Sequence, residues 1–415
     1  MKKTDVVVIG GGPCGLAVAR GCSQTGASCV ILEREGRLGG ILNQCIHNGF
    51  GLQMFNEELT GPEYAKRWID LVEGDKRVGV SLNSFVDEIQ KTENGFRVFA
   101  YSPQGLIEIE CGAVVMALGC RERPATAIEM KGSRPSGIFS AGCAQKLINV
   151  YGKKVGKKVA ILGSGDIGLI MARRLICEGA EVVGIYEIMP QSGGLARNIT
   201  QCVRDFDIPL KLSTTVTRVE GENRLTGIYV APVNEKLQPI MELEKFVECD
   251  TLLVSIGLIP ENEIADKFNL ERIPATGSFA VDEFFQTSMD GLFCAGNVLH
   301  VNDLVDNVSR EGQTAGYFAG LFALGKRPKG KRIAITFDEH IKYTAPKYVY
   351  KSGGTVKVSF RVNKNYKKVV IRAYSGGEEI SKRPCPAVIA GEMQTIEIDK
   401  SKLKDDLHFE IEVRE

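Results

Sequence analysis

The sequence contains twelve cysteines but no closely spaced pair of them. No two cysteines are closer than seven positions, and the motif C-x-x-C does not occur. Structural zinc sites and cysteine-bound iron–sulfur clusters usually take their ligands from close pairs, so this spacing disfavours both kinds of site. We therefore predict no metal centre and expect most of the thiols to be small buried side chains.

Long apolar runs and an excess of charge are also missing. No segment approaches the roughly 18 apolar residues that a membrane-spanning helix requires. Residues 1–5 lead straight into the strand-like run 6–9, without the apolar core of a signal peptide. The formal net charge of +1 gives no reason to expect nucleic acid as a partner. We expect a cytoplasmic protein with no membrane span.

Glycine, by contrast, is abundant, and part of it forms the pattern G-x-G-x-x-G at Gly10, Gly12 and Gly15. The pattern lies between the strand-like run 6–9 and an Ala-rich helical stretch. In such a turn the first glycine makes the bend, the second lets the backbone approach a pyrophosphate, and the third lets helix pack on strand. Glu33 follows Gly10 by 23 residues, at the end of the next strand. Its carboxylate can accept both hydroxyls of a ribose, so the segment predicts a dinucleotide site.

A second copy of the pattern occupies Gly163, Gly165 and Gly168, and its strand-end acid is Glu187. This acid favours NADH over NADPH, because a 2′-phosphate would meet a negative charge. The three residues after Glu187 include no arginine that would replace it. The choice between NADH and NADPH stays open at this point, because Arg197 lies ten residues after Glu187 and a loop can bring it back to the site of a 2′-phosphate.

The arrangement of strands and helices predicts an α/β protein with two Rossmann-like dinucleotide-binding domains. Each glycine pattern is followed later by an apolar strand that ends in glycine, and a further strand at 291–297 leads to a helix predicted from Gly312 to Leu324. A basic linker begins at Lys326, and period-2 alternation beyond it indicates a small β-rich domain. The predicted FAD-binding domain is discontinuous and comprises residues 1–121 and 260–325. The predicted NAD(P)-binding domain comprises residues 122–259, and the C-terminal β-rich domain comprises residues 331–415.

The order of these motifs resembles the pyridine nucleotide-disulfide oxidoreductase superfamily over roughly residues 1–325. The resemblance implies a glutathione-reductase-like fold, with FAD in the first domain, NAD(H) in the second and hydride exchange between them. It also implies a polar group for the flavin's ribityl chain, where the family has aspartate and this chain has Asn297, and a helix start beneath the flavin ring near Gly312 and Gln313. The FAD-binding residues so predicted are Gly10, Gly12, Pro13, Gly15, Glu33, Gly40, Gly119, Gly296, Asn297, Gly312 and Gln313.

The redox dithiol of the family's disulfide reductases is absent. Leu42 and His47 stand where the two cysteines would follow the Gly39-Gly40 pair, and the nicotinamide domain has only Cys143 in place of its C-x-x-C. Disulfide reduction is therefore not expected. Cys45 and His47 stay catalytic candidates, as a peroxide-reducing thiol and a proton donor, and the alternative is a buried cysteine and a hydrogen-bonded histidine that support the FAD pocket.

A closer resemblance is to flavoprotein subunits of the opine oxidase, hydrogen cyanide synthase and dye-linked proline dehydrogenase group, and to relatives associated with anaerobic glycerol-3-phosphate dehydrogenase. It rests on segments 117–124, 134–145 and 296–306, and implies electron exchange with another dehydrogenase or electron-transfer subunit, or a small acceptor. An oligomer is compatible with it. The alternatives are a self-sufficient NADH oxidase, peroxidase or amine-type dehydrogenase, and a mainly structural flavoprotein subunit. His300, Asp303 and Asp306 either line the flavin edge or cap and cover the surface.

Overall fold

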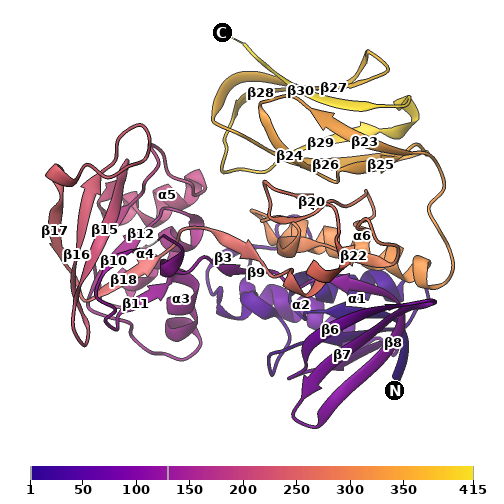
Figure 1. Ribbon diagram of the computed structural model, residues 1–415, viewed down its shortest axis with the longest axis horizontal. Helices are drawn as coiled ribbons and strands as arrows, with labels where there is room; N and C mark the ends of the chain where they lie inside the picture. Colours follow the sequence, from indigo (N-terminus) through magenta and orange to yellow (C-terminus); the bar gives the residue numbers. More distant parts are fainter. Residues whose placement is uncertain (1, 129, 415) are drawn as a thin grey trace. The chain divides into compact units, whose positions relative to one another are not determined.

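A computed structural model describes residues 2–128 and 130–414 (Figure 1). The outer limits of the predicted domains, at residues 1 and 415, lie outside these described residues. The chain forms two compact units, of which unit 1 comprises Met1–Cys120 and Pro260–Glu415 and unit 2 comprises Arg121–Ile259. Each unit contains a parallel sheet with helices, so the predicted α/β class is confirmed.

The main sheet of unit 1 is built around β1. This strand pairs in parallel with β2 and with β8, and β8 pairs in parallel with β22. An antiparallel meander of β6, β7 and β8 extends one side. The strand order is β5-β2-β1-β8-β7-β6, with β22 beside β8, and the strands are β1 Lys2–Ile9, β2 Cys29–Leu32, β5 Val78–Ser81, β6 Phe85–Thr92, β7 Gly95–Ser102, β8 Gly105–Met116 and β22 Leu292–Cys294.

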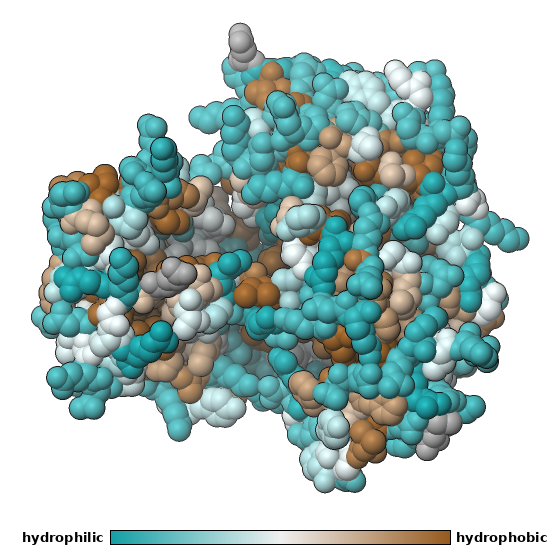
Figure 2. Space-filling model, viewed as in Figure 1, coloured by the Kyte–Doolittle hydropathy of each residue, from teal (hydrophilic) through white to brown (hydrophobic). Residues whose placement is uncertain are grey.

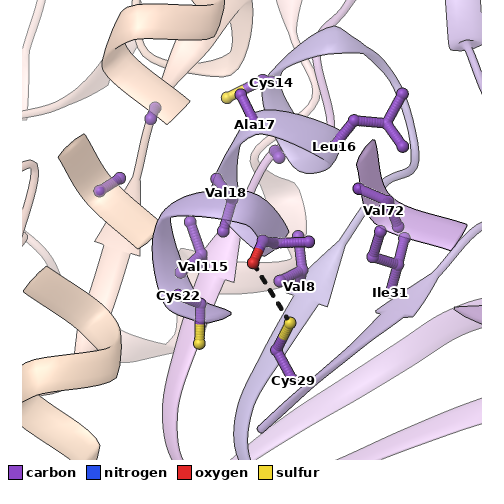
Figure 3. Close-up of a cluster of buried hydrophobic side chains, with 14 of the residues drawn as sticks. Val8, Cys14, Leu16, Ala17, Val18, Cys22, Cys29, Ile31, Val72 and Val115 are labelled. Atoms are coloured by element: carbon purple, nitrogen blue, oxygen red, sulfur yellow. Dashed lines mark hydrogen bonds between the residues drawn. The ribbon is translucent and has the colours of Figure 1, made fainter. Parts of the chain in front are cut away.

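Helices α1 (Pro13–Ser23), α2 (Gly61–Glu73) and α6 (Val305–Ala323) contribute to one buried apolar cluster with this sheet. Figure 3 shows part of the cluster, in which the Cys29 thiol donates to the Ala19 carbonyl at 3.8 Å. Cys14 and Cys22 are buried in the same cluster. Seven of the twelve cysteines are buried, as expected for thiols that serve as small packing groups.

Unit 2 repeats the plan of a parallel sheet with a glycine turn after its central strand. The strand order of this parallel sheet is β11-β18-β12-β13-β14, and helices α3, α4 and α5 lie between its strands in the sequence. Unit 2 also contains a four-stranded sheet with the order β10-β15-β16-β17. The main elements are β10 Lys131–Gly132, β11 Ile138–Ser140, α3 Ala141–Asn149, β12 Lys158–Leu162, α4 Asp166–Cys177, β13 Glu181–Tyr186, α5 Ala196–Cys202, β14 Leu210–Lys211, β15 Thr214–Gly221, β16 Leu225–Pro232, β17 Lys245–Glu248 and β18 Thr251–Val254.

The C-terminal part of unit 1, residues 331–414, consists of two sheets that share an apolar core. The segments with period-2 alternation are 355–362, 369–374 and 409–413, and all three lie in strands, because their alternating apolar side chains point into this core. We call these residues the C-terminal β-domain. The sheets have the orders β25-β23-β30-β27-β28 and β24-β26-β29, and the strands are β23 Arg332–Phe337, β24 Ile341–Ala345, β25 Tyr348–Tyr350, β26 Thr355–Val362, β27 Tyr366–Ser375, β28 Glu378–Val388, β29 Gln394–Asp399 and β30 Leu407–Val413.

One predicted boundary is wrong. Helix α6 begins at Val305, seven residues before the predicted start at Gly312. Its buried face already includes Val308 and continues at a helical spacing through Gly312 and Gly316, so the packing against α1 extends the helix toward the N-terminus. Gly312 and Gln313 therefore lie inside the helix rather than at its start.

Figure 2 shows mainly hydrophilic side chains on the face that it draws, with hydrophobic ones scattered among them. Among residues 2–128 and 130–414, none of the helices combines the length and the apolarity that a membrane crossing requires.

Candidate dinucleotide-binding sites

The first glycine turn joins β1 to α1 and is closely packed at its two ends. Gly10 has a φ of 103°, and a Cβ there would lie 2.5 Å from the Ala117 carbonyl oxygen. A Cβ on Gly15 would lie 1.8 Å from the Gly10 oxygen. Only glycine fits either position, since both contacts are far below van der Waals distance and the partner is backbone.

The middle glycine of this turn, Gly12, is different. The nearest protein atom to a Cβ there is the Gly40 Cα, at 3.9 Å, so the protein's own packing leaves room for a side chain. Gly12 is also the N-cap of α1, with Pro13 at the helix start and no side-chain cap among the described residues. Backbone N–H groups at such a helix end favour an anion, and a small residue lets it come close. The turn thus fits a pyrophosphate.

Glu33 is held against this turn by two hydrogen bonds. Its Oε2 accepts from the Gly11 N–H at 2.6 Å, and its Oε1 accepts from the Glu35 N–H at 2.7 Å. The carboxylate is buried. These bonds fix the acid beside the turn, where a ribose next to the pyrophosphate would lie.

The second glycine turn, between β12 and α4, has the same construction. Gly163 has a φ of 94°, and its Cβ would lie 2.1 Å from the Ser255 carbonyl oxygen. A Cβ on Gly168 would lie 2.9 Å from the Ser255 Cβ and 3.0 Å from the Gly163 oxygen. At the middle glycine, Gly165, the nearest atom would be 3.6 Å away. Each turn therefore has two glycines that the packing requires and one that it does not.

Glu187 occupies the place in unit 2 that Glu33 has in unit 1. It accepts from the Ser164 N–H at 2.9 Å and from the Met189 N–H at 2.9 Å. The Ser164 hydroxyl adds a third bond of 2.7 Å that the first copy lacks, because Gly11 stands there. Among the residues described, no lysine or arginine pairs with Glu187, and Arg197 is exposed on α5.

The loop after β13 folds onto the second glycine turn, which the sequence did not predict. The Ser192 hydroxyl donates to the Ser164 carbonyl at 3.1 Å, and the Gly193 N–H donates to the Ser164 hydroxyl at 3.2 Å. The Leu195 N–H donates to Asp166 at 2.8 Å. Ser164 and Asp166 thus shape this site, and the acid in the first turn of α4 is the one feature of the sequence that points to such a role.

The residues that follow β22 lie against the start of α1. Gly296 has a φ of 75°, and a Cβ there would lie 3.0 Å from the Cys14 side chain. The Asn297 side-chain oxygen accepts from the Asn302 N–H at 3.0 Å, and its Nδ2 lies 3.9 Å from the Cys120 sulfur. The structure therefore places Gly296 beside the first turn and Asn297 beside the chain that leaves β8.

Gly40 and Gly119 complete the predicted first site. Gly40 has a φ of 53°, and its Cβ would lie 3.0 Å from the Gly12 Cα, so this loop is adjacent to the middle glycine of the turn. Gly119 has a φ of 73° and no atom within 4 Å of a Cβ position. Gly312 serves a different purpose, because its Cβ would lie 2.5 Å from the Cys14 carbonyl oxygen, where α6 packs on α1. The N-terminal end of α6 is at Leu304 and Val305, and not at Gly312.

Hydrogen bonds and an ion pair within unit 1 engage the side chains of His300, Asp303 and Asp306. The His300 Nε2 lies 2.7 Å from the Glu311 carboxylate, and the His300 ring is buried. Asp303 forms an ion pair with Arg361 of the C-terminal β-domain. Asp306 accepts from the backbone N–H of residue 53 at 2.8 Å. The burial of His300 and Asp306 does not fit a surface role, and a position at the flavin edge stays a prediction.

Cys45 and His47 lie in the loop after Gly40. The Cys45 thiol donates to the Ile41 carbonyl at 3.3 Å, and burial raises the pKa of this thiol to about 12. The His47 Nδ1 lies 3.0 Å from the Asn48 carbonyl oxygen, so that nitrogen carries a proton, and its ring packs against Phe50. A protonated thiol is a poor nucleophile, which weighs against chemistry at Cys45.

Residues 2–128 and 130–414 contain no group of three or more His, Cys, Asp or Glu side chains arranged to hold a metal ion.

Comparison with known proteins agrees with this geometry. The family model described as pyridine nucleotide-disulphide oxidoreductase matches residues 4–314. The hydrogen cyanide synthase subunit HcnB of Pseudomonas protegens is 25% identical over 304 residues, which cover 68% of this chain and 61% of that protein. The sarcosine oxidase subunit alpha of Corynebacterium sp. (strain U-96) is 26% identical over 274 residues, covering 62% of this chain and 26% of that protein. The chain thus spans about three fifths of the length of HcnB.

Among solved structures, the thioredoxin reductase of T. acidophilum superposes with a TM-score of 0.64 at 23% identity, covering 78% of this chain and 99% of that one. At this identity the likeness establishes the fold.

Proposed function

The chain belongs to the pyridine nucleotide-disulphide oxidoreductase family, whose members are FAD-dependent oxidoreductases, and from this premise we propose that it oxidises NADH through FAD and delivers the electrons to a partner protein or a small acceptor. One observation carries the proposal. Each unit contains a glycine turn of the same construction, with a middle glycine that the protein's own packing does not require and an acid held beside it.

In unit 1, Gly12, Gly40 and the first N–H groups of α1 would hold the FAD pyrophosphate, and Glu33 the ribose next to it. Asn297 and Gly119 each follow a strand end by three residues, after β22 and β8, and would face the flavin part of the cofactor. When bound, FAD supplies the ring that accepts a hydride from a reduced nicotinamide. The chain's own contribution is to bind and orient the cofactor.

In unit 2, Gly165 and the start of α4 would receive the pyrophosphate of the nicotinamide cofactor, and Glu187 its adenine ribose. We propose NADH rather than NADPH because Glu187 is buried with only neutral donors around it. A 2′-phosphate there would add negative charge next to a carboxylate that no described cation neutralises.

An anaerobic titration tests both statements. The purified protein should carry FAD, and NADH should bleach its visible absorption, while NADPH should do so much more weakly. Glu187→Gln keeps the shape of the side chain and removes its charge, so it should reduce the preference for NADH by about tenfold, a change worth roughly 1.4 kcal/mol. FAD content should stay at the wild-type level, since Glu187 belongs to the other site.

Purification of the protein without bound FAD would contradict the proposal that unit 1 binds FAD. Bound flavin that NADH does not bleach would exclude NADH as donor and favour the structural-subunit alternative. Equal bleaching by the two cofactors would overturn the preference for NADH.

The proposed acceptor rests on the relatives. Two of them are named as subunits, of hydrogen cyanide synthase and of sarcosine oxidase, which supports a partner for this chain as well. The alternative of a self-sufficient oxidase, peroxidase or amine-type dehydrogenase would use a reactive group near the flavin, for which Cys45 and His47 are the candidates. The raised pKa of Cys45 weighs against that group being its thiol, and leaves His47 as the remaining candidate.

A further inference from the structure

The C-terminal β-domain holds the segment 296–304, which we call the flavin loop because it contains Gly296 and Asn297. The contacts between the domain and this segment are made mainly by Arg361, on β26. Its guanidinium pairs with Asp303 at 2.5 Å, donates to the Val301 carbonyl at 3.0 Å, and also donates to the Gly391 carbonyl of its own domain. The second oxygen of Asp303 accepts from the Met393 N–H at 2.6 Å. Val301 and Asp303 of the flavin loop are thus held by residues that lie outside the segment matched by the family model, 4–314.

The residue between these two points is Asn302, and it contacts Asn297 directly. The Asn302 N–H donates to the Asn297 side-chain oxygen at 3.0 Å. The Asn297 Nδ2 lies 3.9 Å from the Cys120 sulfur, and the oxygen keeps a second lone pair, so the bond from Asn302 sets the orientation in which the amide presents both groups. Arg361 holds the Val301 carbonyl, which belongs to the same peptide as the Asn302 N–H, and the side chain of Asp303 on the other side of Asn302, so it restrains the N–H that orients the Asn297 amide.

The base of the flavin loop is held from α6. One Glu311 oxygen accepts from the Gly296 N–H at 2.9 Å, and the other lies 2.7 Å from His300 Nε2. The His300 ring packs edge-on against Tyr343 of the C-terminal β-domain, with ring centres 5.9 Å apart. The Asn302 side chain is held from the same side, because its Nδ2 donates to the His300 carbonyl at 3.3 Å and to Glu311 at 3.4 Å, while the Arg361 contacts hold Val301 and Asp303.

The Arg361 contacts are protected from solvent. The side chains of Arg361 and Asp303 are 15% and 16% exposed. Burial opposes the charge on Arg361, yet the neighbouring Asp303 and Tyr343 raise its pKa above the ordinary value. The guanidinium bonds three acceptors with two of its nitrogens, a geometry that a lysine ammonium reproduces only in part.

Other ion pairs attach the C-terminal β-domain without touching the flavin loop. Lys347 pairs with Glu271 at 2.5 Å, and Glu271 also accepts from the Tyr348 hydroxyl. Residue 271 precedes β22 and lies outside the flavin loop. Lys347 therefore provides a matched control, since its loss weakens the attachment of the domain and leaves the contacts of Asn297 unchanged.

We propose that Arg361 is a positioning residue for the flavin, through which the C-terminal β-domain sets the retention and the reduction potential of FAD. The inference rests on the proposed placement of FAD against Asn297. It gives the C-terminal β-domain, which lies beyond the residues matched by the family model, a part in the redox site.

The test compares Arg361→Gln with Lys347→Gln in the full chain purified with its FAD. Arg361→Gln should raise the rate of FAD release about tenfold, the loss expected for hydrogen bonds to a charged group. It should also shift the visible spectrum and the midpoint potential of the bound flavin. Lys347→Gln should lower the melting temperature and change neither FAD release nor potential. Arg361→Lys, which retains the ion pair, should recover part of the wild-type behaviour.

Wild-type FAD release and potential in Arg361→Gln, with only a lower melting temperature, would overturn the proposal. If Arg361→Gln does not fold, the same comparison between Arg361→Lys and Lys347→Gln decides the question. These measurements use no nicotinamide cofactor, so a failure of NADH to reduce the wild-type protein would contradict the proposed donor and leave this test intact.

Discussion

At the scale of single residues, the environment of Cys45 determines whether its thiol can react. Burial raises its pKa to about 12, so at pH 7.5 only roughly one thiol in 10⁴ to 10⁵ is ionised. Cys143 and Cys177, by contrast, are exposed. We predict that iodoacetamide at pH 7.5 modifies Cys143 and Cys177 within minutes and leaves Cys45 unmodified, as measured by peptide mass spectrometry.

Labelling in concentrated urea provides the control for that experiment, because every thiol should react once the chain is unfolded. Modification of Cys45 in the folded protein as fast as that of Cys143 would refute the prediction. It would also return the thiol to the list of catalytic candidates.

The residues that could be predicted from the sequence are those whose requirement is local. Gly10 and Gly163 have positive φ values in a turn between strand and helix, and Glu33 and Glu187 stand at a fixed spacing from them. The Arg361 contact with Asp303 could not be predicted. It joins residues 58 positions apart, and its geometry depends on how a whole domain packs.

At the scale of elements, the pairing of α1 with α6 depends on small residues. A Cβ on Gly316 would lie 2.0 Å from the Val18 carbonyl oxygen, and one on Gly320 would lie 2.4 Å from the Thr25 hydroxyl. We predict that Gly316→Ala destabilises the protein by about 1–3 kcal/mol, because the helices must separate to admit the methyl group. The better helix propensity of alanine, about 1 kcal/mol, offsets only part of this loss.

Thermal melting followed by circular dichroism measures this effect. Gly353→Ala serves as the control, since no atom lies within 4 Å of its Cβ position and its φ is outside the left-handed region. A melting temperature for Gly316→Ala equal to that of Gly353→Ala would show that α1 and α6 tolerate the added methyl group.

Buried polar residues explain why the start of α6 was predicted incorrectly. A run of polar residues before Gly312 reads as a loop that leads into a helix. In the structure Ser309 is buried, and its hydroxyl accepts from the Tyr64 hydroxyl at 2.8 Å. Polar residues thus continue the buried face of the helix, and their partners on α2 cannot be deduced from local sequence.

At the scale of the whole molecule, residues 331–415 contain an excess of cationic side chains, with 17 Lys and Arg against 12 Asp and Glu. The structure uses several of them to attach the C-terminal β-domain to the rest of unit 1. Lys400 is the most buried of these, and its ammonium lies 2.9 Å from the Glu283 carboxylate and 2.9 Å from the Ser352 hydroxyl. The other Glu283 oxygen accepts from the Tyr350 N–H at 2.8 Å. The pair is therefore buried, with two hydrogen bonds from the ammonium and a bond to each carboxylate oxygen.

We predict that Lys400→Met destabilises the protein by about 3–5 kcal/mol, because it leaves the buried Glu283 carboxylate without its cation. The double variant Lys400→Met with Glu283→Gln should recover much of the loss, since the buried charge is then gone and the Tyr350 N–H keeps an acceptor. Urea unfolding of the single and double variants measures both effects. A double variant no more stable than Lys400→Met would mean that Lys400 acts through its packing and its bond to Ser352, and that the charge of Glu283 contributes little to the attachment of the domain.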